Sequence, residues 1–176
     1  MIHFIHTNGL ADLIAAGLKS RPGFKKNMSN DKSGDSAGPF HGGAFKEIEH
    51  TADRALKIYG SDLRQLLLNA AVGLNSLLVP QCDASIGQKI KSVALEAIDA
   101  ESLLVEWLSE LAYWAESELL VFHKFDLHSV SSTHVKATIH GNRVAQLENH
   151  IKAVTYHNLK IIQTDEGLTV TVVFDV

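Results

Sequence analysis

The sequence contains little cysteine and no long apolar run. Cys82 is the only cysteine in 176 residues, which excludes an internal disulfide and is compatible with a reducing compartment. No stretch approaches the roughly 20 apolar residues that a membrane-spanning helix needs. The mildly apolar residues 2–18 lack the basic start of a secretory signal. These absences predict a cytoplasmic protein with no membrane contact.

A basic balance is also missing. The formal net charge is -4, so the chain offers no general attraction for a nucleic-acid backbone, and we expect no direct nucleic-acid binding. Hydrophobic residues make up 45% and charged residues 20%, which excludes a wholly disordered chain. A length of 176 residues predicts one well-buried domain.

Several catalytic and metal motifs are absent. The chain has no HExxH, no paired CxxC, no GxSxG and no glycine-rich phosphate loop. Ten histidines suggest a zinc site, for which His50, His150 and His157 are candidate ligands. The scattered spacing favours surface or hydrogen-bonded positions for most of them.

The composition divides the chain in two. Residues 27–43 are nearly all Ser, Asp, Asn, Gly and Lys, which bury too little apolar surface to offset the entropy lost on ordering. We therefore interpret residues 1–43 as an N-terminal extension, either disordered or the result of a misplaced start, with Met28 as the true first residue. The folded domain is predicted to span residues 44–176.

The domain begins with a predicted strand pair and a helix. Residues 44–50 and 54–59 mix apolar and polar side chains in short runs that indicate strands on either side of a turn. Ser61 is expected to cap a following helix, whose leucines and alanines recur at helical spacing. Pro80 is expected to end this helix.

A third strand and a second helix follow. Residues 89–98 alternate apolar and polar side chains, which predicts a strand. Asp99 is expected to cap a helix with one apolar stripe. Its two tryptophans, Trp107 and Trp114, are interpreted as core anchors rather than a ligand site.

The remaining sequence carries strand signals only. Residues 119–130 and 135–140 predict two strands, and Gly141 with Asn142 is expected to form a turn. Residues 151–161 and 168–176 are expected to pair as an antiparallel hairpin. The order of elements predicts an α+β fold, in which two α-helices pack on one or more largely antiparallel β-sheets in a single domain.

Two aspartates at the ends of predicted strands are candidates for cation binding. Asp53 follows the first turn and Asp175 is followed by Val176. With the terminal carboxylate of Val176 they would form an oxygen-rich cluster for a hard cation, Ca²⁺ or Mg²⁺. Isolated aspartates more often face solvent or cap turns, and spacing alone does not show that the two ends meet. Lys152 is either an outward-facing strand residue or a functional cation.

Three blocks in order resemble the archease family. They are Glu49–Asp53 (EHTAD), Ile151–His157 (IKAVTYH) and the closing Phe174–Val176 (FDV). Between them, Leu103–Leu108 (LLVEWL) resembles the leucine-rich second helix of the family. The resemblance covers residues 45–176.

The resemblance implies a metal site formed by Asp53, Asp175 and the terminal carboxylate of Val176, with Ca²⁺ preferred over Mg²⁺. It places Lys152 near this site, where it would touch the partner or its nucleotide. His50 and His157 match the motif blocks and are assigned to orientation of the ligands or to turn packing.

The resemblance also implies a chaperone-like accessory protein rather than an enzyme. Its partner would be the GTP-dependent tRNA-splicing RNA ligase, whose guanylylation and multiple turnover the family promotes. Two features depart from the family: the N-terminal extension, and Arg54 directly after the motif aspartate, which would place a positive charge beside the metal.

Two other functions stay open on the residues alone. One is a metal-dependent hydrolase that uses Asp53, His50, His157 and Asp175 around a catalytic ion. The other is an interaction module whose charged ends are only solvated. The sequence does not distinguish oligomeric states.

Overall fold

The computed structural model describes residues 44–49, 53–78 and 86–176. The predicted extension 1–43, the turn residues 50–52 and the expected helix-ending Pro80 lie outside these residues. The described elements, in chain order, are β1 Phe45–Glu49, β2 Arg54–Gly60, α2 Leu63–Leu78, β3 Ile86–Glu96, α3 Ala100–Glu118, β4 Leu120–Val130, β5 His134–Arg143, β6 Ala153–Thr155, β7 Ile162–Thr164 and β8 Gly167–Asp175. They confirm the predicted α+β fold.

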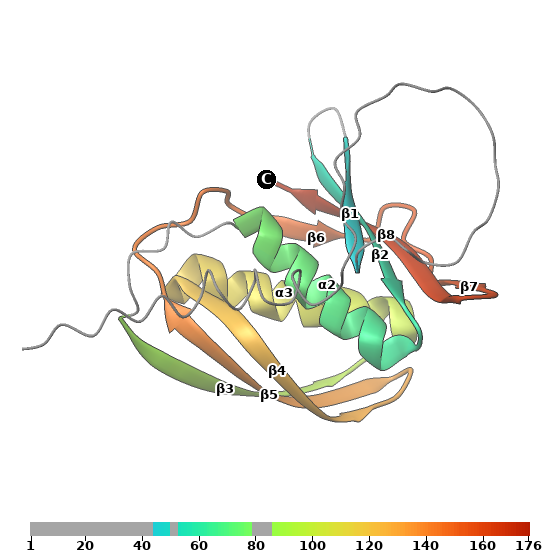
Figure 1. Cartoon of the computed structure of the whole chain (residues 1–176), viewed down its shortest axis with the longest axis horizontal. Helices are drawn as coiled ribbons and strands as arrows, with labels where there is room; N and C mark the ends of the chain where they lie inside the picture. The colour runs from blue at the N-terminus through green and yellow to red at the C-terminus, as the bar shows by residue number, and fades with distance from the viewer. Residues whose placement is uncertain (1–43, 50–52, 79–85) are drawn as a thin grey trace, which may run out of the picture. The chain divides into compact units, whose positions relative to one another are not determined.

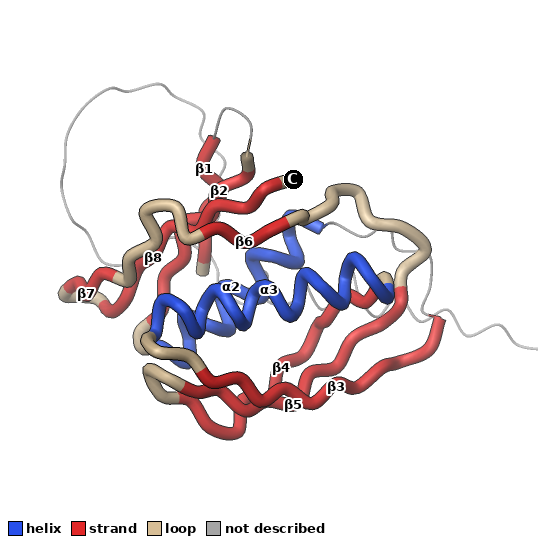
Figure 2. The backbone as a smooth tube through the Cα atoms, turned by 180° about the vertical axis from the view of Figure 1, so that it is seen from behind, coloured by secondary structure: helices blue, strands red, loops and turns tan. Residues whose placement is uncertain are grey.

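The strands form two antiparallel sheets. One sheet has the order β1-β2-β8-β6, with β7 also paired to β8, and is called sheet A. The other has the order β3-β5-β4 and is called sheet B. Helices α2 and α3 lie between the two sheets (Figures 1 and 2). The last strand, β8, therefore lies inside sheet A rather than at its edge.

The core fills the space between each sheet and the helices. Trp107 of α3 is fully buried, and its Nε1 donates to the Leu67 carbonyl oxygen of α2 at 3.0 Å. The rings of Trp107 and Trp114 meet those of Phe125 and Phe122 edge-on, with centroids 6.0 and 5.6 Å apart. Both tryptophans are thus core anchors, as predicted. Neither described helix is long and apolar enough to cross a membrane.

The helix caps agree with the sequence at α3 and differ at α2. Asp99 accepts a hydrogen bond from the Ser102 backbone N–H at 2.7 Å, as expected of its cap. The prediction of Ser61 as the cap of α2 is wrong by one residue, because Asp62 Oδ1 accepts from the Gln65 backbone N–H at 2.8 Å. Aspartate and serine are nearly equal as caps. The type of residue therefore does not distinguish Ser61 from Asp62, and the backbone conformation before α2 decides which one caps the helix.

The predicted turn at Gly141 and Asn142 is wrong, since both residues lie within β5. Gly141 is needed for a close approach between strands: an added Cβ would lie 2.6 Å from the Val121 carbonyl oxygen. The facing strand β4 has a register shift between Phe122 and Lys124. Glycine at a bulge permits this contact between backbones.

The predicted long strand at residues 151–161 is only partly correct. Only Ala153–Thr155 and, later, Ile162–Thr164 pair with β8. Between them Asn158 adopts a left-handed φ of 51°, which ends the extended conformation. Glu101 Oε1 then accepts from the Ile161 backbone N–H at 3.1 Å. Contacts with α3 therefore override the alternating pattern.

Candidate functional site

The central position of β8 brings Asp53 and Asp175 to the same end of sheet A. Arg54 of β2 pairs with Phe174 of β8, and Ala153 of β6 pairs with Asp175 on the other side. Continued by one residue, the β2–β8 register sets Asp53 across from Asp175. Directly opposed residues have Cβ atoms about 5 Å apart. The start of β2, the start of β6 and the end of β8 thus lie together at one end of sheet A, although they are far apart in the sequence.

Alternation along β8 decides which side chains face solvent. Phe174 is fully buried in the core and Val176 packs partly against it. Asp175, between them, points to the opposite face and is exposed. Asp53 is partly buried. Asp175 therefore belongs to the outer face of sheet A, where water and ions have access, and Asp53 lies at the same end of the sheet, one residue before β2.

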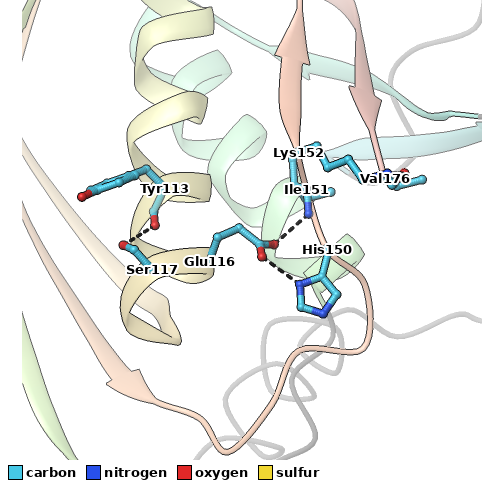
Figure 3. A network of polar contacts seen from close by, with 7 residues as sticks. All are labelled: Tyr113, Glu116, Ser117, His150, Ile151, Lys152 and Val176. Carbon is cyan, nitrogen blue, oxygen red and sulfur yellow. Dashed lines mark hydrogen bonds and ion pairs between the residues drawn. The ribbon is translucent and has the colours of Figure 1, made fainter.

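Lys152 binds the end of β8 by its main chain and its side chain. Its backbone N–H donates to the Asp175 carbonyl oxygen at 2.9 Å, and its Nζ donates to the main-chain oxygen of Val176 at 2.7 Å. Figure 3 shows the side chain extended along this path. Lys152 is exposed. The sequence prediction placed Lys152 near the candidate site, and the structure brings it to Val176, one of the predicted site residues.

Glu116 of α3 fixes the chain just before Lys152. Its Oε1 accepts from the Ile151 backbone N–H at 2.8 Å, and its Oε2 lies 2.8 Å from His150 Nδ1 (Figure 3). Sequence reasoning gave Glu116 no role. A glutamate on a helix, 35 residues from its partner, has no local pattern that separates it from a solvent-facing residue.

Arg54 is directed away from the two aspartates. Its guanidinium donates to Glu47 Oε1 on the neighbouring strand β1. By strand alternation Arg54 lies on the same side of β2 as Leu56, opposite to Asp53. In this arrangement the Arg54 guanidinium is paired with Glu47, and its effect on a cation at the aspartates stays a prediction.

The predicted histidines take different positions. His50 lies outside the described residues. His157 is exposed in the turn after β6, where its Nε2 lies 3.1 Å from Asn158 Nδ2. His150, a candidate zinc ligand, contacts Glu116 instead.

The donors at the end of sheet A suit a hard cation better than zinc. Asp53, Asp175 and the main-chain oxygen of Val176 are all oxygen donors, the type that Ca²⁺ and Mg²⁺ prefer. Within the described part of the chain, no group of three or more His, Cys, Asp or Glu side chains could hold a metal ion. A cation here would therefore need the Val176 oxygen and water molecules to complete its coordination.

Comparison with known proteins decides the family. Residues 45–176 match the model of the Archease protein family (MTH1598/TM1083). The chain belongs to the archease family. It is 34% identical over 146 residues to protein archease of Methanosarcina acetivorans, covering 78% of this chain and 99% of that archease. Protein archease of Archaeoglobus fulgidus is 32% identical over 136 residues, with coverages of 75% and 98%.

Solved structures of the archease fold also match. The solution structure of Methanobacterium thermoautotrophicum protein 1598 has a TM-score of 0.59 and 26% identity, covering 76% of this chain and 99% of its own. A Thermotoga maritima protein, described as an archease and possible chaperone, has a TM-score of 0.56 and 24% identity, with coverages of 77% and 100%. The archease match leaves out residues 1–44 of this chain.

Proposed function

We propose that this archease-family chain is a chaperone-like accessory protein of the GTP-dependent tRNA-splicing RNA ligase, not an enzyme. In this role it promotes guanylylation of the ligase and its multiple turnover. The observation that supports the proposal is the register of β8, which pairs Phe174 with Arg54, the residue after Asp53, and Asp175 with Ala153, the residue after Lys152. Membership of the archease family supports the choice of partner.

The two aspartates and Val176 form the cation site in this proposal. Asp53 and Asp175 supply side-chain carboxylates, and Val176 supplies a main-chain oxygen. Ca²⁺ is the preferred ion and Mg²⁺ the alternative, because both take oxygen donors and retain water in open sites. The bound cation would supply positive charge that neutralises phosphate oxygens at the ligase's nucleotide site.

Lys152 is the residue of this end that meets the partner. Lys152 is exposed, and its ammonium reaches Val176, the residue after β8. An ammonium group binds phosphate as a point charge, so Lys152 suits the phosphates of a nucleotide in the ligase.

Calorimetric titration tests the cation site. Ca²⁺, Mg²⁺ and Zn²⁺ are titrated into the wild type, Asp53→Asn and Asp175→Asn, with Asp165→Asn as the matched control from an exposed position in the β7–β8 turn. We expect Ca²⁺ or Mg²⁺ to bind the wild type and the control, and each site variant to bind at least tenfold more weakly, as loss of one charged ligand predicts. Equal affinity in all four proteins would contradict the site.

Ligation assays test the function. Purified RNA ligase, in limiting amount over an excess of RNA ends, is assayed with and without this protein. We expect the wild type and Asp165→Asn to restore multiple turnover, and Asp53→Asn and Asp175→Asn to fail. Full restoration by the two site variants would disprove the link to the cation. A phosphoesterase assay of the protein alone tests the hydrolase alternative, for which we expect no activity.

A further inference from the structure

The chain segment that carries Lys152 is held on both sides by hydrogen bonds. On one side, both carboxylate oxygens of Glu116 are engaged, one by the Ile151 backbone N–H and one by His150 Nδ1, each at 2.8 Å. On the other side, the Lys152 backbone N–H donates to the Asp175 carbonyl oxygen at 2.9 Å. Figure 3 shows Glu116 reaching from α3 toward this segment.

Glu116 acts at the point where the path of the segment is set. Ile151 is 2% exposed and packs in the core, so its backbone N–H has little access to water. The carboxylate supplies the acceptor that this N–H needs. With Ile151 fixed, the next residue starts from a defined position, and its side chain reaches the Val176 oxygen at 2.7 Å.

We infer that Glu116 is a positioning residue, which ties α3 to the segment just before β6 and thereby sets the Lys152 ammonium on the main-chain oxygen of Val176. The role of Lys152 at the ligase rests on the proposed function, whereas its placement by Glu116 does not. Without the Glu116 carboxylate, residues 150 and 151 lose these hydrogen bonds to α3, although Ile151 still packs in the core. The Lys152 side chain then spends less time at Val176 and more in solvent.

The chain offers matched variants that separate the contacts of Glu116. Glu116→Ala removes both. Glu116→Gln keeps an amide oxygen for the Ile151 N–H, with an amide N–H₂ facing His150. His150→Ala removes only the second contact, at a side chain that is 66% exposed.

Lysine acylation measured by mass spectrometry reports the position of Lys152 without the ligase. An ammonium held by an oxygen acceptor is acylated more slowly than one that is freely solvated, and the exposed Lys160 gives an internal reference in the same molecule. We expect Glu116→Ala to raise the Lys152 to Lys160 ratio of acylation about two- to fivefold, the factor that an exposed charged contact gives. Glu116→Gln and His150→Ala should stay near the wild-type ratio.

A purely structural role for Glu116 would change the thermal stability and leave the acylation ratio unchanged. An unchanged ratio in folded Glu116→Ala, or an equal rise in Glu116→Gln, would overturn the inference. Circular dichroism confirms that each variant is folded. If the ratio rises in Glu116→Ala but Lys152→Gln still supports full multiple turnover by the ligase, the positioning role stands and the proposed role of Lys152 fails.

Discussion

The Nζ atom of Lys152 lies 2.7 Å from the main-chain oxygen of Val176. The ammonium therefore occupies part of the negative end where a cation is proposed to bind, and the two positive charges repel. We predict that Lys152→Gln raises the affinity for Ca²⁺ about ten- to thirtyfold, the effect of removing one unit charge about 4 to 6 Å from a divalent ion in a water-like medium. Calorimetric titration at low ionic strength measures this change.

The control for this prediction is Lys160→Gln, which removes an exposed positive charge from the turn before β7. It keeps the same net charge as the Lys152 variant, so it corrects for long-range electrostatics. Weaker cation binding in Lys152→Gln than in this control would mean that Lys152 orders the site rather than competing with the ion.

Gly60 lies against backbone atoms at the start of α2, so there is no room for a side chain at this position. A Cβ on Gly60 would lie 2.4 Å from the Leu66 backbone nitrogen and 2.7 Å from its Cα. Since backbone cannot rotate away as a side chain can, we predict that Gly60→Ala lowers the free energy of unfolding by about 3 kcal/mol. Urea denaturation measures this value.

The comparison for Gly60 is Gly87→Ala. Gly87 has a φ of +69° but no atom within 4 Å of an added Cβ, so only the left-handed conformation opposes a side chain. We expect a loss of about 1 kcal/mol. A smaller loss at Gly60 than at Gly87 would show that the β2–α2 junction relaxes easily.

Two threonines on the outer face of sheet A provide opposite tests of hydrogen bonding. Thr155 Oγ1 is buried without a hydrogen-bond partner in the described structure, whereas Thr169 Oγ1 donates to the Ile58 carbonyl oxygen at 3.1 Å. Valine matches threonine in shape. We predict that Thr155→Val is neutral or stabilising, and that Thr169→Val costs about 1 kcal/mol. Equal losses in thermal unfolding would indicate that Thr155 finds a partner in solution.

His123 gives the fold a defined pH dependence. Burial, and then the positive charges of His140 and Lys124, lower the pKa of His123 from its ordinary 6.5. Its neutral form therefore stabilises the fold above about pH 6.5, and this contribution is lost as the pH falls through 6.5 toward the folded-state pKa. We predict that His123→Gln weakens this loss in urea unfolding between about pH 7.5 and 5.

The control is His128→Gln, which removes an exposed histidine from the same strand. If His123→Gln keeps the full wild-type dependence on pH, another group dominates the acid response of the fold.

The periodic parts of the fold were predictable from the sequence. The apolar spacing located α2 and α3, the cap at Asp99 was correct, and alternation identified β5 through its buried Val135, Ala137 and Ile139. These elements are determined by side chains within one segment. The place of Gly141 within β5 was not predictable, because glycine is required there by the close backbone of Val121 on another strand.

The candidate site follows the same division. Asp53, Asp175 and Lys152 could be proposed because they stand at the ends of strong patterns or in family blocks. Their common position depends on the register of β8 with β2 and β6, which spacing alone does not fix. Glu116 was missed because its two partners, His150 and the Ile151 main-chain N–H, are 34 and 35 residues away in the sequence.

The interior position of β8 has a consequence for folding during synthesis. A nascent chain that has been translated through β5 already contains α2, α3 and all of sheet B, but only the β1–β2 hairpin of sheet A. Strand β2 cannot pair with β8 until β8 has been translated. Even the β2–β8 pair that is closest in sequence, Gly60 with Leu168, is separated by more than 100 residues. Such distant pairing closes slowly. The end of sheet A that holds Asp53 is therefore assembled only after the ribosome has translated Asp175.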